Sequence, residues 1–180
     1  MCTARVLFIA LCAGALLGGA ATRSWAAESN EGGGLGNTAA AIHQRVLFQA
    51  PCTKVYDALT QSARFDAMTR LSDAVSLVTA PGAKATEIDA QVGGAFTLFG
   101  GYITGRNLEM LAGKRLVQAW RAGSWRPGEY SIVRFELADE PTGCNLTFDH
   151  TGFPDSQGQS LLHGWGVHYW TPLKKLLSGA

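Results

Sequence analysis

Between residues 96 and 151, hydrophobic residues recur at every second position in a series of short segments. Residues 130–137 show the pattern most clearly, because Val133, Phe135 and Leu137 alternate with polar or charged side chains. A period of two is typical of a strand with one buried face. Short turns separate the segments, so the pattern predicts an antiparallel meander. The expected strands are 96–98, 102–111, 116–122, 130–137 and 145–151.

The segment Gly93–Asn107, GGAFTLFGGYITGRN, is apolar and yet interrupted by glycine pairs. Glycine adopts backbone conformations that other residues avoid, so glycines within a strand pattern predict turns and bulges. Gly100 and Gly101 are expected to form a hairpin turn. A sheet with such bends is curved, and its concave face needs another element to cover it.

The segment before the meander predicts one further strand, which begins near Ile42, includes Val46 and Phe48 and ends near Gln49, followed by two short helices. Proline favours the first turn of a helix, so residues 51–59 are expected to be helical. Ser62 is a candidate cap for a second helix that ends near Met68. The sequence APGA at residues 80–83 predicts a turn.

The C-terminal segment, residues 157–177, predicts one long helix. Apolar residues recur on one of its faces at helical spacing, namely Leu162, Trp165, Tyr169, Leu173 and Leu176. Pro172 removes the hydrogen bond to the carbonyl of His168 and is expected to bend the helix. The order of strand, two short helices, meander and long helix predicts an α+β fold with a sheet of six to seven strands.

The first 26 residues have the pattern of a secretory signal peptide. Arg5 precedes an apolar run from Val6 to Leu17, and Ser24-Trp25-Ala26 offers small residues for cleavage after Ala26. The alternative is an N-terminal membrane anchor, for which the apolar run is short. Residues 27–41 are rich in glycine and polar side chains and are expected to form a flexible leader. The domain is therefore expected at residues 42–178 of an exported protein, periplasmic or secreted.

Removal of residues 1–26 changes the charge and the cysteine content. The 15 basic and 14 acidic side chains become 13 and 14, so electrostatics gives no reason to expect binding to nucleic acid or to an anionic membrane. Two of the four cysteines remain, Cys52 and Cys144. In an oxidising compartment they either form a disulfide or stay as two buried thiols that never meet.

The sequences FTLFGGYITG, KRLVQAWR, WRPGEYSIVRFEL and GW…YW appear in this order along the chain. In this respect residues 42–177 resemble the C-terminal domain of the activator of the heat shock protein 90 ATPase, a START-like (SRPBCC) family. The resemblance is most specific over residues 93–128. It implies a helix-grip fold, in which a curved antiparallel sheet grasps a long C-terminal helix, often around an apolar cavity.

The resemblance also bears on the cysteines and on the activity. In the family fold the first strand pairs antiparallel with the last, which would place Cys52 beside Cys144 and imply a disulfide. Ala50 stands where family members often have a capping serine or threonine, so the first helix is expected to begin weakly. The family's namesake is cytosolic and has a further N-terminal domain, so the resemblance implies the fold more strongly than the activity.

Alternation predicts which side chains face the concave side of the sheet. They are Phe96, Leu98, Leu108, Met110, Leu116, Trp120, Phe135, Leu146 and Phe148, and the polar Tyr102, Arg106, Gln118 and His150 share their parity. These residues either form plain core under the helix or line an apolar cavity with a few polar groups, as in small-molecule sites. In the second interpretation the ligand-binding residues are Phe96, Leu98, Leu108, Met110, Trp120, Phe135, Phe148, His150, Trp165 and Tyr169.

The histidines do not have the spacing of a metal site. His163 and His168 are five residues apart on the expected helix, which would place them on different faces, and Asp149 and His150 should point to opposite sides of one strand. No metal and no cofactor is expected.

Three functions remain. The first is an exported domain that binds a small hydrophobic ligand without catalysis. The second is an enzyme of the polyketide cyclase or lyase type, using the same cavity with His150, or Arg106 and Tyr102, as acid–base groups. The third is a protein-binding, co-chaperone-like module.

Overall fold

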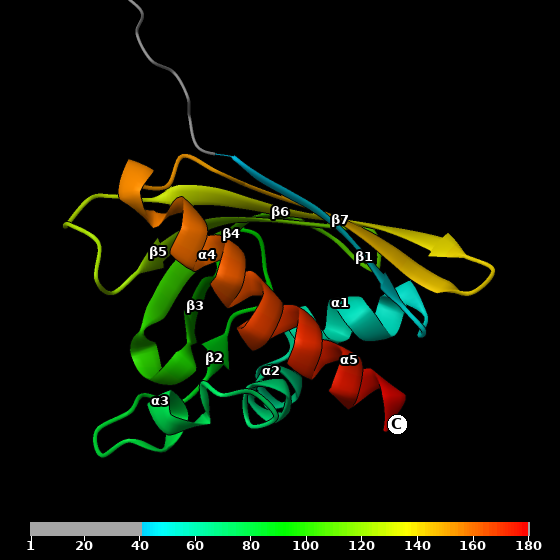
Figure 1. The fold of residues 1–180 in the computed structure, drawn as a ribbon, viewed down its shortest axis with the longest axis horizontal. Helices are drawn as coiled ribbons and strands as arrows, with labels where there is room; N and C mark the ends of the chain where they lie inside the picture. Colours follow the sequence, from blue (N-terminus) through cyan, green and yellow to red (C-terminus); the bar gives the residue numbers. More distant parts are fainter. Residues whose placement is uncertain (1–40, 180) are drawn as a thin grey trace, which may run out of the picture. The chain divides into compact units, whose positions relative to one another are not determined.

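The computed structural model describes residues 41–179, which form one antiparallel sheet and the helices that cover it (Figure 1). The predicted signal peptide and most of the predicted leader lie outside the described residues. The strands are β1 (Ile42–Phe48), β2 (Glu87–Ile88), β3 (Ala95–Leu98), β4 (Ile103–Leu111), β5 (Arg115–Ala122), β6 (Ser131–Glu140) and β7 (Gly143–Thr151). Their order in the sheet is β1-β7-β6-β5-β4-β3-β2. The first strand thus pairs with the last, as the helix-grip fold requires.

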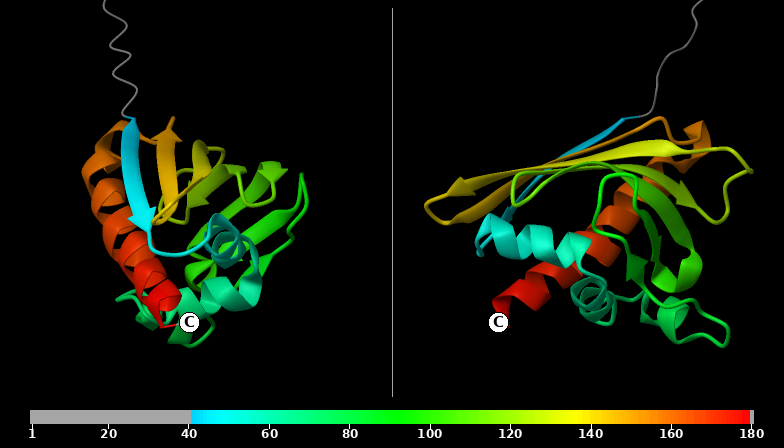
Figure 2. Two further views of the ribbon diagram at one scale, coloured as in Figure 1. Left: turned by 90° about the vertical axis from the view of Figure 1, so that its right-hand side faces the viewer. Right: turned by 180° about the vertical axis from the view of Figure 1, so that it is seen from behind.

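The helices lie on the concave side of this sheet (Figure 2). They are α1 (Cys52–Thr60), α2 (Ser62–Thr69), α3 (Val75–Thr79), α4 (Gly158–Gly164), the π-helical η3 (Trp165–Trp170) and α5 (Thr171–Ser178), with short 3₁₀ turns η1 (Phe99–Gly101) and η2 (Asp155–Gln157). Trp165 and Tyr169 are 2% and 5% exposed, and the Trp165 ring centroid lies 4.3 Å from that of Phe148. The expected helix-grip is therefore confirmed.

The C-terminal helix is continuous through α4, η3 and α5 but changes its hydrogen-bonding pattern in the middle. Pro172, in the first turn of α5, has no N–H to donate to the preceding turn. The π-helical turn immediately before it spans Trp165–Trp170, and π-turns replace bonds to the fourth residue by bonds to the fifth. The hydrogen-bonding pattern of the helix is thus irregular in the turn that precedes Pro172.

Two glycines of the segment 93–107 are required by close contacts. Gly100 has a φ of 69°, and a Cβ there would collide with the backbone carbonyl of Leu77 in α3. Gly105 faces the concave side, where a Cβ would collide with the ring of Phe96 and the carbonyl of Ala119. The glycines therefore allow the chain to approach α3 on one side and a buried aromatic ring on the other.

The expectation that Leu108 faces the concave side was wrong. A β-bulge between Asn107 and Glu109 shifts the register of β4 against β5, and the Leu108 side chain is 47% exposed. Asn107 is fully buried instead, where it accepts a hydrogen bond from Gln118 Nε2 at 3.0 Å and donates one to the carbonyl of Asp89 at 2.8 Å. A strand parity cannot be carried across a bulge, because the extra residue reverses it.

The same reversal affects Tyr102 and Arg106, which were expected to share the concave face. Both side chains are exposed, and Ile103 is the buried residue at the start of β4. Arg106 donates to the carbonyl of Gly93 at 2.8 Å.

The start of α1 is held by two residues that are distant from it in the sequence, Asp139 and Cys144. Cys52 is bonded to Cys144, with 4.8 Å between their Cα atoms, so the expected disulfide is present. The backbone N–H of Cys52 donates to Asp139 Oδ1 of β6 at 3.2 Å. A carboxylate near a helix N-terminus stabilises it. Asp139 and the disulfide thus supply what the absent side-chain cap does not.

Two elements and one contact were not expected from the sequence. The short helix α3 and the two-residue strand β2 went unrecognised, and Ser62 does not cap α2 but accepts a hydrogen bond from the backbone N–H of Ile88 at 2.9 Å.

Within residues 41–179, no helix is both long enough and apolar enough to cross a bilayer.

The disulfide is expected to contribute about 2–4 kcal/mol to the free energy of unfolding, because it closes a loop with a sequence separation of 92 residues. A Cys52→Ser/Cys144→Ser variant should show this loss in urea unfolding. Reductant should destabilise the parent protein and leave the variant unchanged. Denatured protein should release two additional thiols on reduction, and equal thiol counts with and without reductant would contradict the bond.

Candidate functional site

A cavity of about 230 Å³ lies between the C-terminal helix, α3 and the adjoining ends of β4 and β5. Its lining comes from four segments of the chain and comprises Ala74, Leu77, Phe99, Tyr102, Ile103, Trp120, Ala122, Gln157, Ser160, Leu161, His163, Gly164, Trp165, His168 and Tyr169. Most of these side chains are apolar or aromatic, with a few polar groups among them. This is the usual make-up of a small-molecule site.

Aromatic rings form the inner wall of the cavity. The Trp165 ring centroid lies 5.8 Å from that of Trp120 and 4.2 Å from that of Tyr169, and Phe99 packs edge-on against Tyr169 at 5.3 Å. At the mouth, the side chains of Tyr102, Ser160 and His163 are exposed. The cavity therefore has a buried aromatic end and a more polar opening.

Phe99 is held in an unusual backbone conformation. Its φ is 51°, and among the non-glycine residues of the described chain no other has a positive φ. A bulky residue rarely adopts this conformation, and such strain persists where the surrounding structure imposes it. Here the hairpin turn between β3 and β4 directs the buried Phe99 ring into the cavity wall.

Three buried polar atoms of the cavity lining have no hydrogen-bond partner among the described residues: Trp120 Nε1, His168 Nδ1 and the Tyr169 hydroxyl. Burial raises the pKa of Tyr169 above its usual range, so the phenol stays protonated. The Trp120 N–H lies near enough to the phenol to act against that rise, but the two groups do not meet in hydrogen-bonding geometry. Burial also lowers the pKa of His168, which favours the neutral imidazole.

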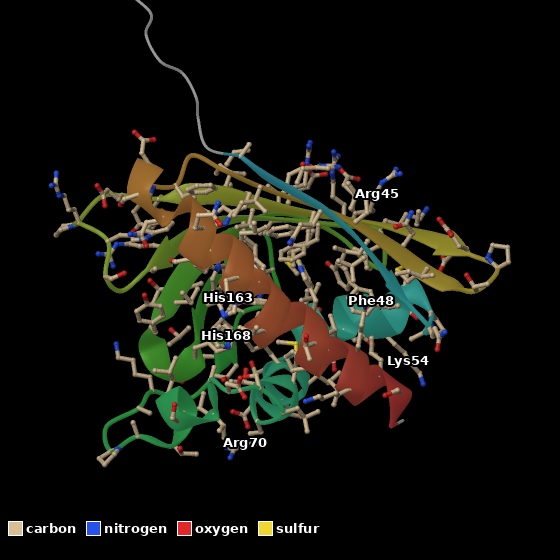
Figure 3. The ribbon with its side chains drawn as sticks, in the orientation of Figure 1. Arg45, Phe48, Lys54, Arg70, His163 and His168 are labelled. Carbon is tan, nitrogen blue, oxygen red and sulfur yellow. A yellow bond between two sulfur atoms is a disulfide. The ribbon has the colours of Figure 1, made fainter. Side chains whose placement is uncertain are left out.

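The expectation that His163 and His168 lie on different faces of the helix was wrong. Both line the cavity, and Figure 3 shows them along the same side of the helix. The π-helical turn accounts for the difference, because its hydrogen bonds bring residues five apart closer to one face.

His150 lies behind this wall and is fully buried. Trp165 Nε1, which can only donate, gives its hydrogen bond to His150 Nδ1 at 3.0 Å. His150 Nε2 therefore carries the proton and donates to Ser131 Oγ at 2.7 Å, and Ser131 in turn donates to the carbonyl of Trp120 at 3.1 Å. Burial lowers the pKa of His150 to about 3. The imidazole is thus neutral, with both nitrogens engaged in joining the helix to the sheet.

The residues proposed from the sequence for ligand binding are divided by the structure. Trp120, Trp165 and Tyr169 line the cavity. Phe96, Leu98, Phe135, Phe148 and His150 are buried in the surrounding core without lining it, Met110 is partly buried, and Leu108 is exposed. Phe96, which was expected to border the pocket beside Trp120, packs under Gly105 instead.

The groups named for acid–base chemistry are not brought together. His150 is enclosed in the core, and Arg106 donates a hydrogen bond to the carbonyl of Gly93 on the exposed side of β4. Tyr102 lies at the cavity mouth, where its hydroxyl pairs with Ser124 Oγ at 3.1 Å. Asp149 points away from His150 and contacts His43 at 2.6 Å, as alternation predicts. Among residues 41–179, no three potential metal ligands of the His, Cys, Asp or Glu type cluster together.

Several lining residues were missed by the sequence reasoning. Leu77 belongs to helix α3, which was not expected from the sequence. Ile103 is the first residue of β4 and Ala122 is the last residue of β5, and neither was expected to line a cavity. The apolar residues of α3, in the sequence VSLVT, were the available signal for a helix there.

The family model described as "Activator of Hsp90 ATPase homolog 1-like protein" matches residues 49–178. An uncharacterized protein of Schizosaccharomyces pombe is 27% identical over 133 residues, covering 74% of this chain and 36% of its own length. The activator of 90 kDa heat shock protein ATPase homolog 2 of Mus musculus is 26% identical over 90 residues, covering 50% and 27%. The chain thus spans about a third or less of these curated relatives.

Solved structures share the fold. An HSP90 activator from Plasmodium falciparum superposes with a TM-score of 0.62 at 20% identity, covering 77% of this chain and 96% of that one. CalU16 from Micromonospora echinospora superposes with a TM-score of 0.56 at 22% identity, covering 77% and 74%. At these identities the likeness concerns the fold alone.

The buried His150 is expected to make the protein less stable as the pH falls. The unfolded chain takes up a proton below about pH 6.5, whereas the folded imidazole does so only near pH 3. The contribution of the neutral His150 to the free energy of unfolding is therefore fully present above pH 6.5. This contribution falls toward pH 3, by at most about 1.4 kcal/mol per pH unit.

A His150→Gln variant provides the measurement. It should be less stable than the parent at pH 7, and urea unfolding should show the difference narrowing below pH 6.5. Nitrogen-15 spectra of the parent should show the Nε2–H tautomer unchanged between pH 8 and 5. A constant difference down to pH 4, or a His150 that titrates near pH 6, would refute this account.

Proposed function

We propose that this chain, which belongs to the activator of Hsp90 ATPase homolog 1-like family, is an exported domain that binds a small apolar molecule without catalysis. The observation that carries the proposal is the aromatic cavity between α3 and the C-terminal helix. The fold and the family support a ligand-binding or co-chaperone-like module, and the cavity favours the first of these.

The size and lining of the cavity support a binding role rather than a packing defect. Protein interiors contain few voids larger than a water molecule, whose share of the liquid is about 30 Å³. The cavity, at about 230 Å³, exceeds that several-fold. An apolar cavity of about 150 Å³ suffices to hold benzene. One substituted ring is therefore an appropriate occupant.

The positions of the acid–base candidates support binding over catalysis. A general base needs to lie within hydrogen-bonding reach of the group from which it takes a proton. His150 is committed to Trp165 and Ser131, and it does not line the cavity. A cyclase- or lyase-like reaction would have to use His168 or His163, neither of which has a carboxylate hydrogen-bonded to it among the described residues.

Two observations support export. Residues 1–26 have the charge, apolar run and small residues of a signal peptide. Independently, Cys52 and Cys144 are disulfide-bonded, and structural disulfides persist in oxidising compartments.

A protein-binding role is the second candidate, and a specific observation favours it. The side chains of Leu71, Val75 and Leu77 are 43%, 37% and 43% exposed within one segment of seven residues. Exposed apolar groups that lie together can serve as a contact surface. The family description and the Plasmodium falciparum structure both refer to Hsp90 activators.

The cavity is expected to bind isopropylbenzene saturably, as followed by NMR titration of the indole N–H signals. A Gly164→Leu variant should weaken this binding at least about tenfold. A Cβ on Gly164 would find only the His168 ring, at 3.8 Å, so a larger side chain there would occupy the cavity.

Gly166→Leu is the matched control, because Gly166 lies two residues along the same helix and does not line the cavity. Both variants exchange a helical glycine for a good helix former, so their effects on helix stability should be similar. Absence of saturable binding in the parent, or an equal loss in both variants, would overturn the binding proposal and leave the protein-binding role in its place.

Export is expected to produce a mature chain that begins at Ala27. When the full chain is produced in a bacterium with a periplasm, the N-terminal sequence of the recovered protein gives the cleavage site. Replacing Leu11 by Arg within the apolar run should retain the precursor in the cytoplasm. Recovery of an uncleaved soluble parent would contradict export.

A further inference from the structure

Unpaired polar atoms gather in the cavity. Buried polar side-chain atoms nearly always have a hydrogen-bond partner, so each exception calls for an explanation. Five such atoms without a partner occur among the described residues, and three of them belong to residues that line this one cavity. The other two, Thr86 Oγ1 and Trp125 Nε1, belong to residues outside the lining. A bound molecule with a hydrogen-bond acceptor would satisfy two of the three, the Trp120 N–H and the Tyr169 hydroxyl.

Two of the three atoms can serve as donors at the buried aromatic end. The indole Nε1 of Trp120 can only donate, and the Tyr169 phenol is kept protonated by its burial. Their side chains are 4% and 5% exposed. Both residues line the cavity and both rings lie beside Trp165, whose centroid is 5.8 Å from that of Trp120 and 4.2 Å from that of Tyr169, so the two donors belong to the same end of the cavity.

The charge of the lining constrains the occupant. No Lys, Arg, Asp or Glu side chain lines the cavity, and burial lowers the pKa of the partly buried His168, which favours its neutral form. An ion that entered would lose its hydration without gaining an opposite charge, which is costly. An uncharged molecule is therefore favoured.

The shape of the wall constrains the occupant further. The rings of Phe99, Trp120, Trp165 and Tyr169 form the buried end, and aromatic side chains favour edge-to-face or offset contacts with another ring. The volume of about 230 Å³ accommodates one ring with a short substituent, but is smaller than most drug-sized sites.

We propose that the ligand is an uncharged one-ring carbonyl compound, such as an aryl ketone, aldehyde, ester or amide. Its carbonyl oxygen accepts hydrogen bonds from the Tyr169 hydroxyl and Trp120 Nε1, and its ring packs among the aromatic side chains of the wall. This assignment rests on the proposed ligand-binding function and adds the polar group that the ligand carries.

Acetophenone and isopropylbenzene test the assignment, because they have the same ring and nearly the same size and differ in the carbonyl oxygen. The full chain should bind acetophenone at least about tenfold more tightly, by NMR titration or calorimetry, which corresponds to about 1.4 kcal/mol. Acetophenone should also shift the Trp120 indole N–H signal downfield, whereas isopropylbenzene should not. Benzoate should bind more weakly than acetophenone.

Tyr169→Phe removes the unpaired hydroxyl and keeps the ring, so it should abolish most of the preference for acetophenone and leave isopropylbenzene binding unchanged. Tyr56→Phe is the matched control. Tyr56 is another buried tyrosine, but it does not line the cavity. Removal of its hydroxyl should leave the preference as in the parent.

The outcomes separate the two proposals. If neither probe binds the parent, the proposed function fails and this inference fails with it. If both bind equally, or if Tyr169→Phe weakens both equally, the cavity is a ligand site but the carbonyl assignment is wrong. Should Tyr169→Phe not fold, the ratio of affinities in the parent and the Trp120 N–H shift decide the matter by themselves.

Discussion

The packing of Trp165 against the sheet is the contact on which the rest of this domain depends. Its ring lies against Phe148 of β7 and against Tyr169 of its own helix, and its N–H reaches through the core to His150. The N–H of a buried Trp usually has a hydrogen-bond partner, and His150 Nδ1 can accept the Trp165 N–H only while the imidazole is neutral. The same side chain thus fixes the height and rotation of the helix over the sheet and supplies one wall of the cavity.

The cavity exists because two irregularities coincide at one end of the sheet. The π-helical turn before Pro172 brings His163 and His168 to the side of the helix that faces α3. The hairpin turn between β3 and β4 carries Phe99 inward and rests on α3 through Gly100. A regular helix and a regular hairpin would present other side chains here. The irregular backbone therefore determines which groups a ligand meets.

The sequence predicted the regular parts of the molecule well. Alternation identified the strands from β3 to β7 apart from their ends, and helical spacing identified the buried face of the C-terminal helix, including Trp165 and Tyr169. It failed at Leu108, because a bulge reverses strand parity and Asn107 gives no local sign that it is the buried residue. It also failed at His163 and His168, because an α-helical spacing was assumed where the helix is π-helical. The candidate site was thus only partly predictable, since its lining is determined at such places and by tertiary contacts such as that between Leu77 and Gly100.

The position of the disulfide has a consequence for how a molecule enters. The strand register places Cys144 opposite Asp139 at one end of β6, and Trp120 opposite Ser131 at the other, so the cross-link and the cavity lie at opposite ends of the sheet. At the cavity end, α3 has no buried side chain of its own. Segments with few buried contacts open locally at a lower free-energy cost than global unfolding. The disulfide thus fixes one end of the sheet, whereas α3 can open locally at the end where the cavity lies. A small molecule can therefore enter or leave without disruption of the sheet.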